Sequence, residues 1–246
     1  VMNKGLFEAS EEGTPQGGPL SPLLSNIMLN ELDKELELRG LPFVRYADDS
    51  MIFCRSRRAA MRVKESITRF IENNLYLKVN QEKTVVSYVR GVKYLGYSFN
   101  VMKGKCQLTV HPTSKAKMKS RLKELTSRSN GWGYSKRKQK LKEYIRGWVG
   151  YYHLANMKRL LLTTDEWLRR RIRMCIWKAW KKVKTKVANL IRCGIDKYKA
   201  YEWGNTRKGC WRIADSHIMH RAITNENLRK AGYATLMGEY LEWYPK

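Results

Sequence analysis

The sequence contains little that would place the protein in a membrane or outside the cell. Its five cysteines are scattered without a Cys-x-x-Cys pair. This pattern indicates free thiols in a reducing compartment and argues against a disulfide framework or a zinc ribbon. No run of 18 apolar residues occurs, which excludes a membrane-spanning helix. The first residues also lack the charged and then apolar pattern of a signal peptide.

Acidic residues are scarce beside basic ones, and the imbalance lies in one part of the chain. The 246 residues include 49 Lys and Arg against 22 Asp and Glu, a net charge of +27. Residues 1–100 carry 14 basic and 12 acidic residues, whereas residues 101–246 carry 35 and 10, with all eight tryptophans. Because Lys and Arg neutralise phosphates and aromatic rings stack on bases, we expect a nucleic-acid partner. An anionic membrane surface is the alternative, but no segment has the apolar face that membrane docking requires.

Hydropathy patterns predict an α+β first part and a helical second part. In the first part we expect helices at Ser21–Leu38, with Ser21 as N-cap, and at Met61–Asn74. The expected strands are Phe43–Tyr46, Met51–Cys54, Val85–Val89, Tyr94–Phe99 and Gln107–Val110. Further helices are expected at Ser114–Ser127, with Ser114 as N-cap, at Ser135–Tyr152, and after a capping box at Thr163–Glu166. We expect domains at residues 1–105, 106–185 and 186–246.

Asp48 and Asp49 stand at the centre of the chemistry that the sequence predicts. Strand-like runs flank them, so both acids would lie at the tip of a hairpin. Two carboxylates so close repel each other unless a cation lies between them, and Mg²⁺ favours carboxylate and phosphate oxygens. The alternative is an ordinary Asp-rich turn, since Asp is common in turns.

Several motifs occur in the order found in reverse transcriptases. Tyr46-Ala47-Asp48-Asp49 resembles their YADD box, and residues 13–22 (GTPQGGPLSP) resemble the Pro-Gln-Gly loop of the group II intron lineage. Residues 77–84 resemble the next palm motif, Val92–Tyr97 the primer-grip strand pair, and residues 114–180 the helical thumb, or maturase X domain. The chain is thus similar to group II intron-encoded reverse transcriptases with maturase activity.

This resemblance implies a fold, a reaction and its partners. The fold would be a partial palm, a small antiparallel sheet with helices, followed by an all-helical thumb or maturase domain and a basic C-terminal RNA- or DNA-binding extension. The protein would be an RNA-directed DNA polymerase with two Mg²⁺ ions, acting on dNTPs and an RNA template/DNA primer duplex. It would also bind group II intron RNA for splicing and retrohoming, in the bacterial cytoplasm or at the nucleoid.

The resemblance also assigns roles to individual residues. Asp48 and Asp49 would be catalytic and would bind metal. The residues implied to contact nucleotide or primer are Pro15, Gln16, Gly17, Tyr46, Ala47, Lys83, Leu95 and Gly96. The basic residues expected to bind RNA are Lys136, Arg137, Lys138, Arg169, Arg170, Arg173, Lys181 and Lys182.

One departure from the family pattern affects the expected activity. The fingers and another aspartate precede the Pro-Gln-Gly loop in the family, but only 12 residues precede Gly13 here. We therefore expect a C-terminal fragment that binds metal weakly and is inactive alone, unless a complementing N-terminal half or a second copy supplies the rest. The alternatives are a catalytically inactive RNA-binding maturase module and another bacterial lineage, such as retron-like or diversity-generating enzymes.

Overall fold

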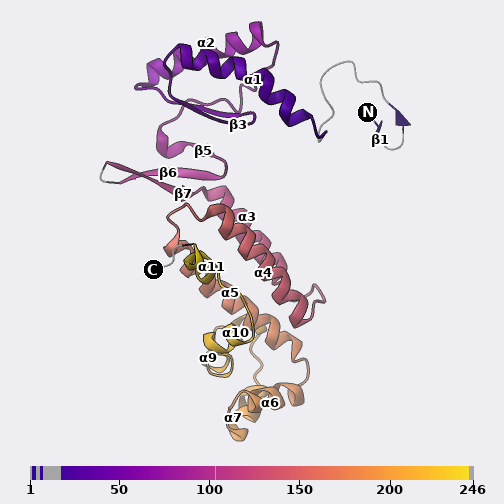
Figure 1. Ribbon diagram of the computed structural model, residues 1–246. Coiled ribbons are helices and arrows are strands. Elements are labelled where there is room, and N and C mark those ends of the chain that lie inside the picture. The colour runs from indigo at the N-terminus through magenta and orange to yellow at the C-terminus, as the bar shows by residue number, and fades with distance from the viewer. Residues whose placement is uncertain (1, 4–5, 8–17, 103, 244–246) are drawn as a thin grey trace. The chain divides into compact units, whose positions relative to one another are not determined.

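The structure is a computed structural model that describes residues 2–3, 6–7, 18–102 and 104–243 (Figure 1). It divides into two compact units, Val1–Tyr94 and Leu95–Lys246. The functional boundaries after residues 105 and 185 remain predictions. Within the described ranges, no helix is both long and apolar enough to cross a bilayer.

The first unit consists of two helices and short antiparallel strand pairs. Its elements are β1 (Met2–Asn3), β2 (Leu6–Phe7), α1 (Ser21–Leu38), β3 (Phe43–Tyr46), β4 (Asp49–Ile52), α2 (Arg57–Asn74), the 3₁₀-helix η1 (Val89–Gly91) and β5 (Lys93–Tyr94). The strand pairs β1–β2 and β3–β4 are both antiparallel. Figure 1 shows α1 and α2 lying over the β3–β4 hairpin.

A small core joins these elements. Leu32 and Leu36 of α1 and Ile67 of α2 are buried, and Phe43 and Ile52 of the hairpin pack against them. The helix at Ser21–Leu38 is confirmed, although Leu20 is its N-cap residue and Ser21 is its first helical residue. In the first half of α1, no described residue buries the apolar side chains. These exposed side chains are Leu23, Leu24, Ile27 and Met28.

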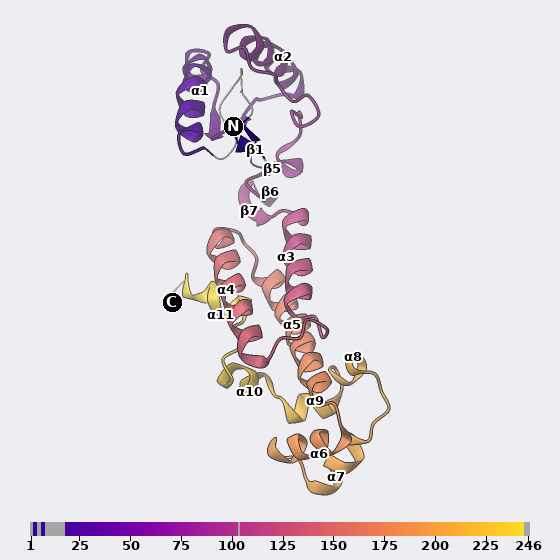
Figure 2. The same cartoon turned by 90° about the vertical axis from the view of Figure 1, so that its right-hand side faces the viewer.

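The second unit begins with a hairpin and continues as helices (Figure 2). The hairpin pairs β6 (Tyr97–Met102) with β7 (Lys105–Val110). The longer helices are α3 (Pro112–Leu125), α4 (Tyr134–Tyr152) and α5 (Lys158–Ala179). Shorter helices follow: α6 (Val183–Arg192), α7 (Lys197–Gly204), α8 (Cys210–Ile213), α9 (His217–Ala222), α10 (Asn225–Lys230) and α11 (Leu236–Glu242).

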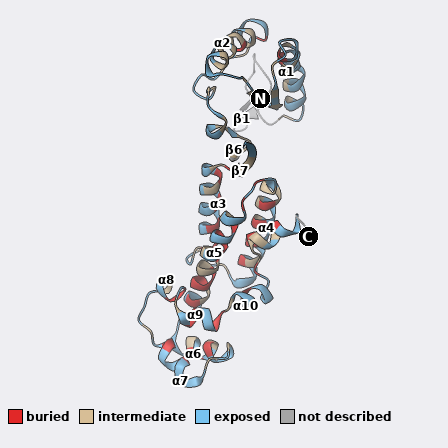
Figure 3. Cartoon of the chain, turned by 90° about the vertical axis from the view of Figure 1, so that its left-hand side faces the viewer, coloured by how far each residue is buried: buried red, intermediate tan, exposed pale blue. Residues whose placement is uncertain are grey.

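The core of the second unit lies among its three long helices. Leu122 of α3, Ile145 of α4 and Leu161 of α5 are each fully buried, and burial of one such side chain contributes about 1.5–3 kcal/mol. Figure 3 shows the buried residues of these helices on the sides that face one another. The tail joins this core through α11, whose Tyr240 hydroxyl donates to the Ala155 carbonyl at 3.1 Å.

Four further predictions of local structure are wrong. The strand expected at Tyr94–Phe99 is interrupted by a turn at Leu95 and Gly96, both of which have positive φ. Val85–Val89 is not a strand; it is irregular chain that ends in η1. The start of α3 is capped by His111, which accepts from the Thr113 amide, so Ser114 lies inside the helix. The sequence at Thr163–Glu166 is no capping box, because α5 begins five residues earlier, at Lys158.

Candidate active site and nucleic-acid surface

The paired acids lie at the tip of the β3–β4 hairpin. Tyr46 pairs with Asp49, which leaves Ala47 and Asp48 as a two-residue turn. Ala47 has a φ of +54°, a left-handed conformation that costs a non-glycine residue about 1–2 kcal/mol. Both carboxylates are exposed, and among the described residues neither forms an ion pair. The turn therefore presents two unneutralised acids to solvent.

Arg45 ties this turn to α1. Its Nε donates to Asp33 Oδ1 at 2.8 Å, and its Nη2 contacts the other oxygen of that carboxylate. Its Nη1 donates to Asn26 Oδ1 at 2.8 Å and to the Ala47 carbonyl at 3.0 Å. The hydrogen bond with Asp33 raises the pKa of Arg45. One planar guanidinium thus fixes the turn on which Asp48 stands.

Two further residues of the first unit lie near catalytic motifs. The Tyr94 hydroxyl donates to the Asp49 carbonyl at 3.5 Å, and burial, followed by the charge of Asp49, raises the pKa of Tyr94. Lys83 is exposed in a turn closed by Asn80, whose side chain accepts from the Lys83 amide at 3.1 Å. Lys64 of α2 donates to the Thr84 carbonyl at 2.6 Å, which attaches that turn to the helix.

Leu95 and Gly96 begin the second unit, where they form a turn held by helices. Both have positive φ, +49° and +78°. Tyr151 Oη donates to the Leu95 carbonyl at 3.0 Å, and Ser114 Oγ donates to the Gly96 carbonyl at 3.0 Å. The predicted primer-grip turn is therefore fixed to α3 and α4. The other predicted nucleotide contacts, Pro15, Gln16 and Gly17, lie outside the described residues.

The eight basic residues predicted to bind RNA do not form one open surface. Lys136, Lys181 and Lys182 are exposed. Lys138 is half-buried and donates to the Ala231 carbonyl at 2.8 Å. Arg169 and Arg170 are also half-buried.

Two of the eight residues lie in the interior, so their expected surface position is wrong. Arg173 donates to the Ile223 carbonyl and to Asn225 Oδ1, each at 2.9 Å, and burial lowers its pKa. Arg137 is also buried and donates to Asn130 Oδ1 at 3.1 Å. Their positions on the predicted helices indicated that both arginines would face solvent. In the structure their guanidinium groups instead donate to loops and tail helices that pack over them.

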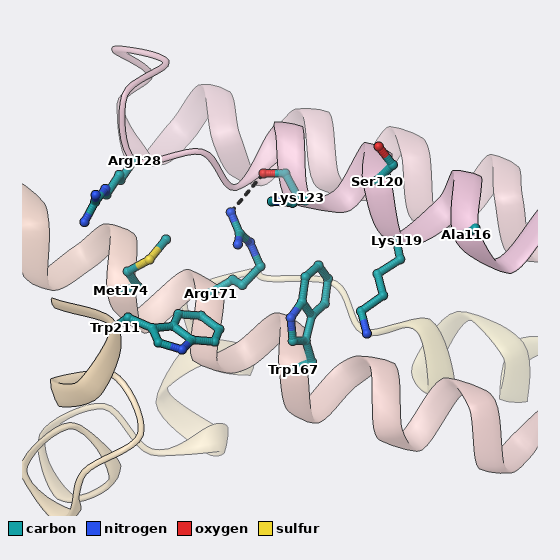
Figure 4. Close-up of a pocket in the computed structure, with 9 residues that line it drawn as sticks. All are labelled: Ala116, Lys119, Ser120, Lys123, Arg128, Trp167, Arg171, Met174 and Trp211. Carbon is teal, nitrogen blue, oxygen red and sulfur yellow. Dashed lines mark hydrogen bonds between the residues drawn. The ribbon is translucent and has the colours of Figure 1, made fainter.

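A groove between α3 and α5 holds a set of cations and aromatic rings that no sequence motif marks (Figure 4). Its volume is about 690 Å³. The charged and aromatic residues that line it are Lys119, Lys123, Arg128, Trp167, Arg171 and Trp211. The sequence shows two lysines four residues apart on one predicted helix, and a tryptophan four residues before an arginine on another. It does not show that these two helices pack together, so the groove could not be predicted from it.

Two family models match successive parts of the chain. Residues 2–99 match the family described as reverse transcriptase (RNA-dependent DNA polymerase). Residues 115–194 match the family described as group II intron, maturase-specific domain. The first match contains the acidic hairpin, and the second contains most of α3, the whole of α4 and α5, and the groove residues except Trp211.

Three curated relatives match parts of the chain. Protein YkfC of Escherichia coli K12 is 33% identical over 131 residues, which cover 39% of this chain and 34% of the relative. The group II intron-encoded protein LtrA of Lactococcus lactis subsp. cremoris is 28% identical over 160 residues, covering 39% of this chain and 27% of LtrA. The retron Ec86 reverse transcriptase of Escherichia coli is 32% identical over 77 residues, covering 30% of this chain and 24% of the retron enzyme. The chain thus spans about a third or less of the length of these relatives.

Proposed function

This chain carries the reverse-transcriptase and maturase regions of a group II intron-encoded protein, and from that premise we propose that the whole protein is an RNA-directed DNA polymerase that also binds its intron RNA. The polymerase would add dNTPs to a DNA primer on an RNA template. The maturase role would be to hold the folded intron during splicing, which is RNA chemistry. A cytoplasmic or nucleoid location is part of the same proposal.

The observation that carries the polymerase proposal is the exposed pair of acids on a tight, anchored turn. Asp48 and Asp49 have no cationic partner among the described residues. The Arg45 contacts to Asp33 and to the Ala47 carbonyl hold the backbone beneath them. Because the backbone of this turn is already fixed, less ordering is needed when the two carboxylates bind a divalent cation.

The donor chemistry of the two acids fits Mg²⁺, the metal that reverse transcriptases use. Carboxylate oxygens are the ligands that Mg²⁺ takes from proteins, with waters and substrate phosphates completing its shell. In the described ranges no third acidic, histidine or cysteine side chain joins the pair. Asp48 and Asp49 would each supply oxygen ligands, and bound Mg²⁺ would offset the charge that develops during nucleotidyl transfer.

Lys83 and the primer-grip turn have supporting roles in this proposal. Lys83 is exposed in the same unit as the acidic hairpin, and it would lend positive charge, or a proton, to the leaving pyrophosphate. Leu95 and Gly96 would support the primer strand. Tyr46, of which 66% is exposed, would lie beside the primer end.

Primer extension on an RNA template tests the polymerase proposal. Extension is measured with Mg²⁺ and dNTPs on the chain alone and on the chain mixed with a reverse-transcriptase segment that supplies the additional aspartate. We expect extension in the mixture, and we expect Asp48→Asn to lower its rate by about a hundredfold or more. The matched control is Glu72→Gln, which removes one exposed negative charge from the same unit on α2.

The same experiment separates the polymerase from an RNA-binding module. Binding of folded group II intron RNA should survive Asp48→Asn, because the acids do not contribute to a cationic surface. Extension by the Asp48→Asn protein at the wild-type rate would contradict the catalytic assignment. Intron binding without extension in any mixture would favour the alternative, a maturase module that binds RNA and does not polymerise.

A further inference from the structure

We propose that the groove between α3 and α5 binds an unpaired stretch of RNA, with a base against its tryptophans and phosphates on its lysines and arginines. The proposal rests on the proposed function, which supplies RNA as the partner, and it adds the form of RNA and the place where it binds. The groove volume of about 690 Å³ lies within the range of about 300–1,000 Å³ that is typical of small-molecule sites.

The charge of the groove is positive and uncompensated. Lys119, Lys123, Arg128 and Arg171 line it, and none of the residues identified along it is acidic. Among the described residues no carboxylate forms an ion pair with any of these four cations. Like charges gathered on one surface attract a polyanion and repel each other without one. The groove therefore matches a phosphate backbone.

One cation of the groove is held rigidly in place. Arg171 Nε donates to Thr126 Oγ1 at 2.6 Å. Its Nη2 donates to the carbonyls of Lys123 and Thr126 at 3.0 Å each. These bonds join α5 to the end of α3, so the guanidinium need not be ordered when a ligand binds. Figure 4 shows Arg171 between Trp167 and Trp211.

The two tryptophans select for bases that are not already stacked in a duplex. The charged groups of Lys119 and Arg171 each lie 5.3 Å from the centroid of the Trp167 ring. Trp211 is 39% exposed, and the Arg170 guanidinium carbon lies 4.0 Å from its ring centroid. Single-strand-binding proteins combine aromatic rings, on which bases stack, with cations that contact the phosphate backbone. An A-form duplex keeps its bases stacked and offers them no such contact.

The test measures the affinity of the full chain for a labelled single-stranded RNA of about 12 nucleotides, within the site sizes of about 4–16 typical of such surfaces. We expect Trp211→Leu, and separately the double variant Lys119→Gln/Lys123→Gln, to weaken binding by about tenfold. The matched charge control is Lys115→Gln/Lys117→Gln, which removes two lysines from α3 outside the groove. The matched ring control is Trp243→Leu, since Trp243 stacks on His153 away from the groove.

A second measurement leaves the protein unchanged. A single strand of equal charge with abasic sites should bind wild-type protein about tenfold more weakly than the intact strand, because stacking is lost while phosphate contacts remain. A duplex of the same length should also bind less tightly. Groove variants that bind the single strand as tightly as their controls would overturn the proposal, and so would an abasic strand that binds like the intact one.

The outcomes also distinguish this proposal from the proposed function. If wild-type protein binds RNA tightly and the groove variants behave like the controls, the groove assignment fails and the proposed function stands. If wild-type protein binds neither this strand nor folded group II intron RNA, the RNA-binding part of the proposed function itself fails. A polyglutamate peptide that displaces the strand as well as unlabelled RNA of equal charge would show that the groove recognises charge alone, which also contradicts the proposal.

Discussion

Gly96 occupies a position where both its backbone angle and its lack of a side chain matter. A Cβ at this position would lie 2.3 Å from Tyr152 Oη and 3.1 Å from Ser114 Oγ, and φ is +78°. We expect Gly96→Ala to lower the free energy of unfolding by about 2–4 kcal/mol, the sum of a left-handed penalty and a packing clash. Urea denaturation of the full chain measures this loss.

Gly104 is the control for the backbone part of this effect. Its φ is +74°, but a Cβ there would meet nothing within 4 Å. Gly104→Ala should therefore lose only about 1 kcal/mol. Equal losses in the two variants would mean that the contact with Tyr152 and Ser114 does not constrain the turn.

The sequence indicated some residue roles and could not indicate others. The YADD motif marked Asp48 and Asp49, because the order of adjacent motifs carries that information. Arg137 and Arg173 resemble their basic neighbours in the sequence, yet both are buried. What distinguishes them is which segments pack over each guanidinium, and those partners lie 7–52 residues away along the chain. Charge reversal at Arg173 therefore tests folding and not RNA binding.

At the scale of elements, Asp165 links α5 to α11. Its two carboxylate oxygens accept from the backbone amides of Leu236 and Met237, each at 2.9 Å. Burial raises the pKa of Asp165, while these two bonds act in the opposite direction. Asp165→Asn leaves one oxygen for two amides, so we expect a loss of about 1–3 kcal/mol in the free energy of unfolding.

Asp196 provides the matched control for this substitution. It caps α7 through a single oxygen, which accepts from both the Tyr198 and Lys199 amides. Asp196→Asn should therefore be nearly neutral, since Asn caps helices as well as Asp does. Thermal unfolding of both variants, followed by the loss of helical circular dichroism, checks the difference. Equal stabilities would contradict a linking role for Asp165.

Arg45 makes a second prediction at this scale, because it joins the acidic hairpin to α1. A lysine cannot bond Asp33, Asn26 and the Ala47 carbonyl together, so Arg45→Lys is not conservative here. We expect a loss of about 1–2 kcal/mol in unfolding free energy and a lower extension rate in the complemented assay.

The control for Arg45 is an ion pair on the surface of α1, the helix to which Arg45 binds. Lys34 and Glu31 are paired at 2.8 Å with both side chains more than half exposed, and such pairs contribute about 0–1 kcal/mol. Lys34→Gln should therefore change stability little and leave extension unchanged. An Arg45→Lys protein that extends primers as fast as Lys34→Gln would show that the anchor does not position the turn.

Element boundaries show where local signals suffice and where they do not. The helix at Ser21–Leu38 is predicted correctly, because a proline near its start and a glycine after its end are strong local signals. The capping box at Thr163–Glu166 fails because two apolar residues that precede it, Met157 and Leu161, are buried in the core of the second unit. Long-range burial extends α5 backward through a sequence that would start a helix in isolation.

At the scale of the whole molecule, the uneven charge is the feature that the sequence reports most directly. Residues 101–246 hold 35 of the 49 basic residues. Composition alone shows this, since a net charge does not depend on the fold. How the charge is used does depend on the fold, because packing buries two arginines and lines the groove between α3 and α5 with others.

The salt dependence of RNA binding tests how exposed cations contribute. Lys181 and Lys182 are exposed between α5 and α6. Each phosphate contact on a single strand contributes about 0.7 to the slope of log affinity against log salt, so Lys181→Gln/Lys182→Gln should reduce that slope by about 1.4. The double variant Arg62→Gln/Arg69→Gln removes the same charge from exposed positions on α2 in the first unit and should leave the slope unchanged. An equal reduction of the salt slope in the two variants would mean that the net charge of the protein acts at a distance. It would contradict direct contact of Lys181 and Lys182 with RNA phosphates.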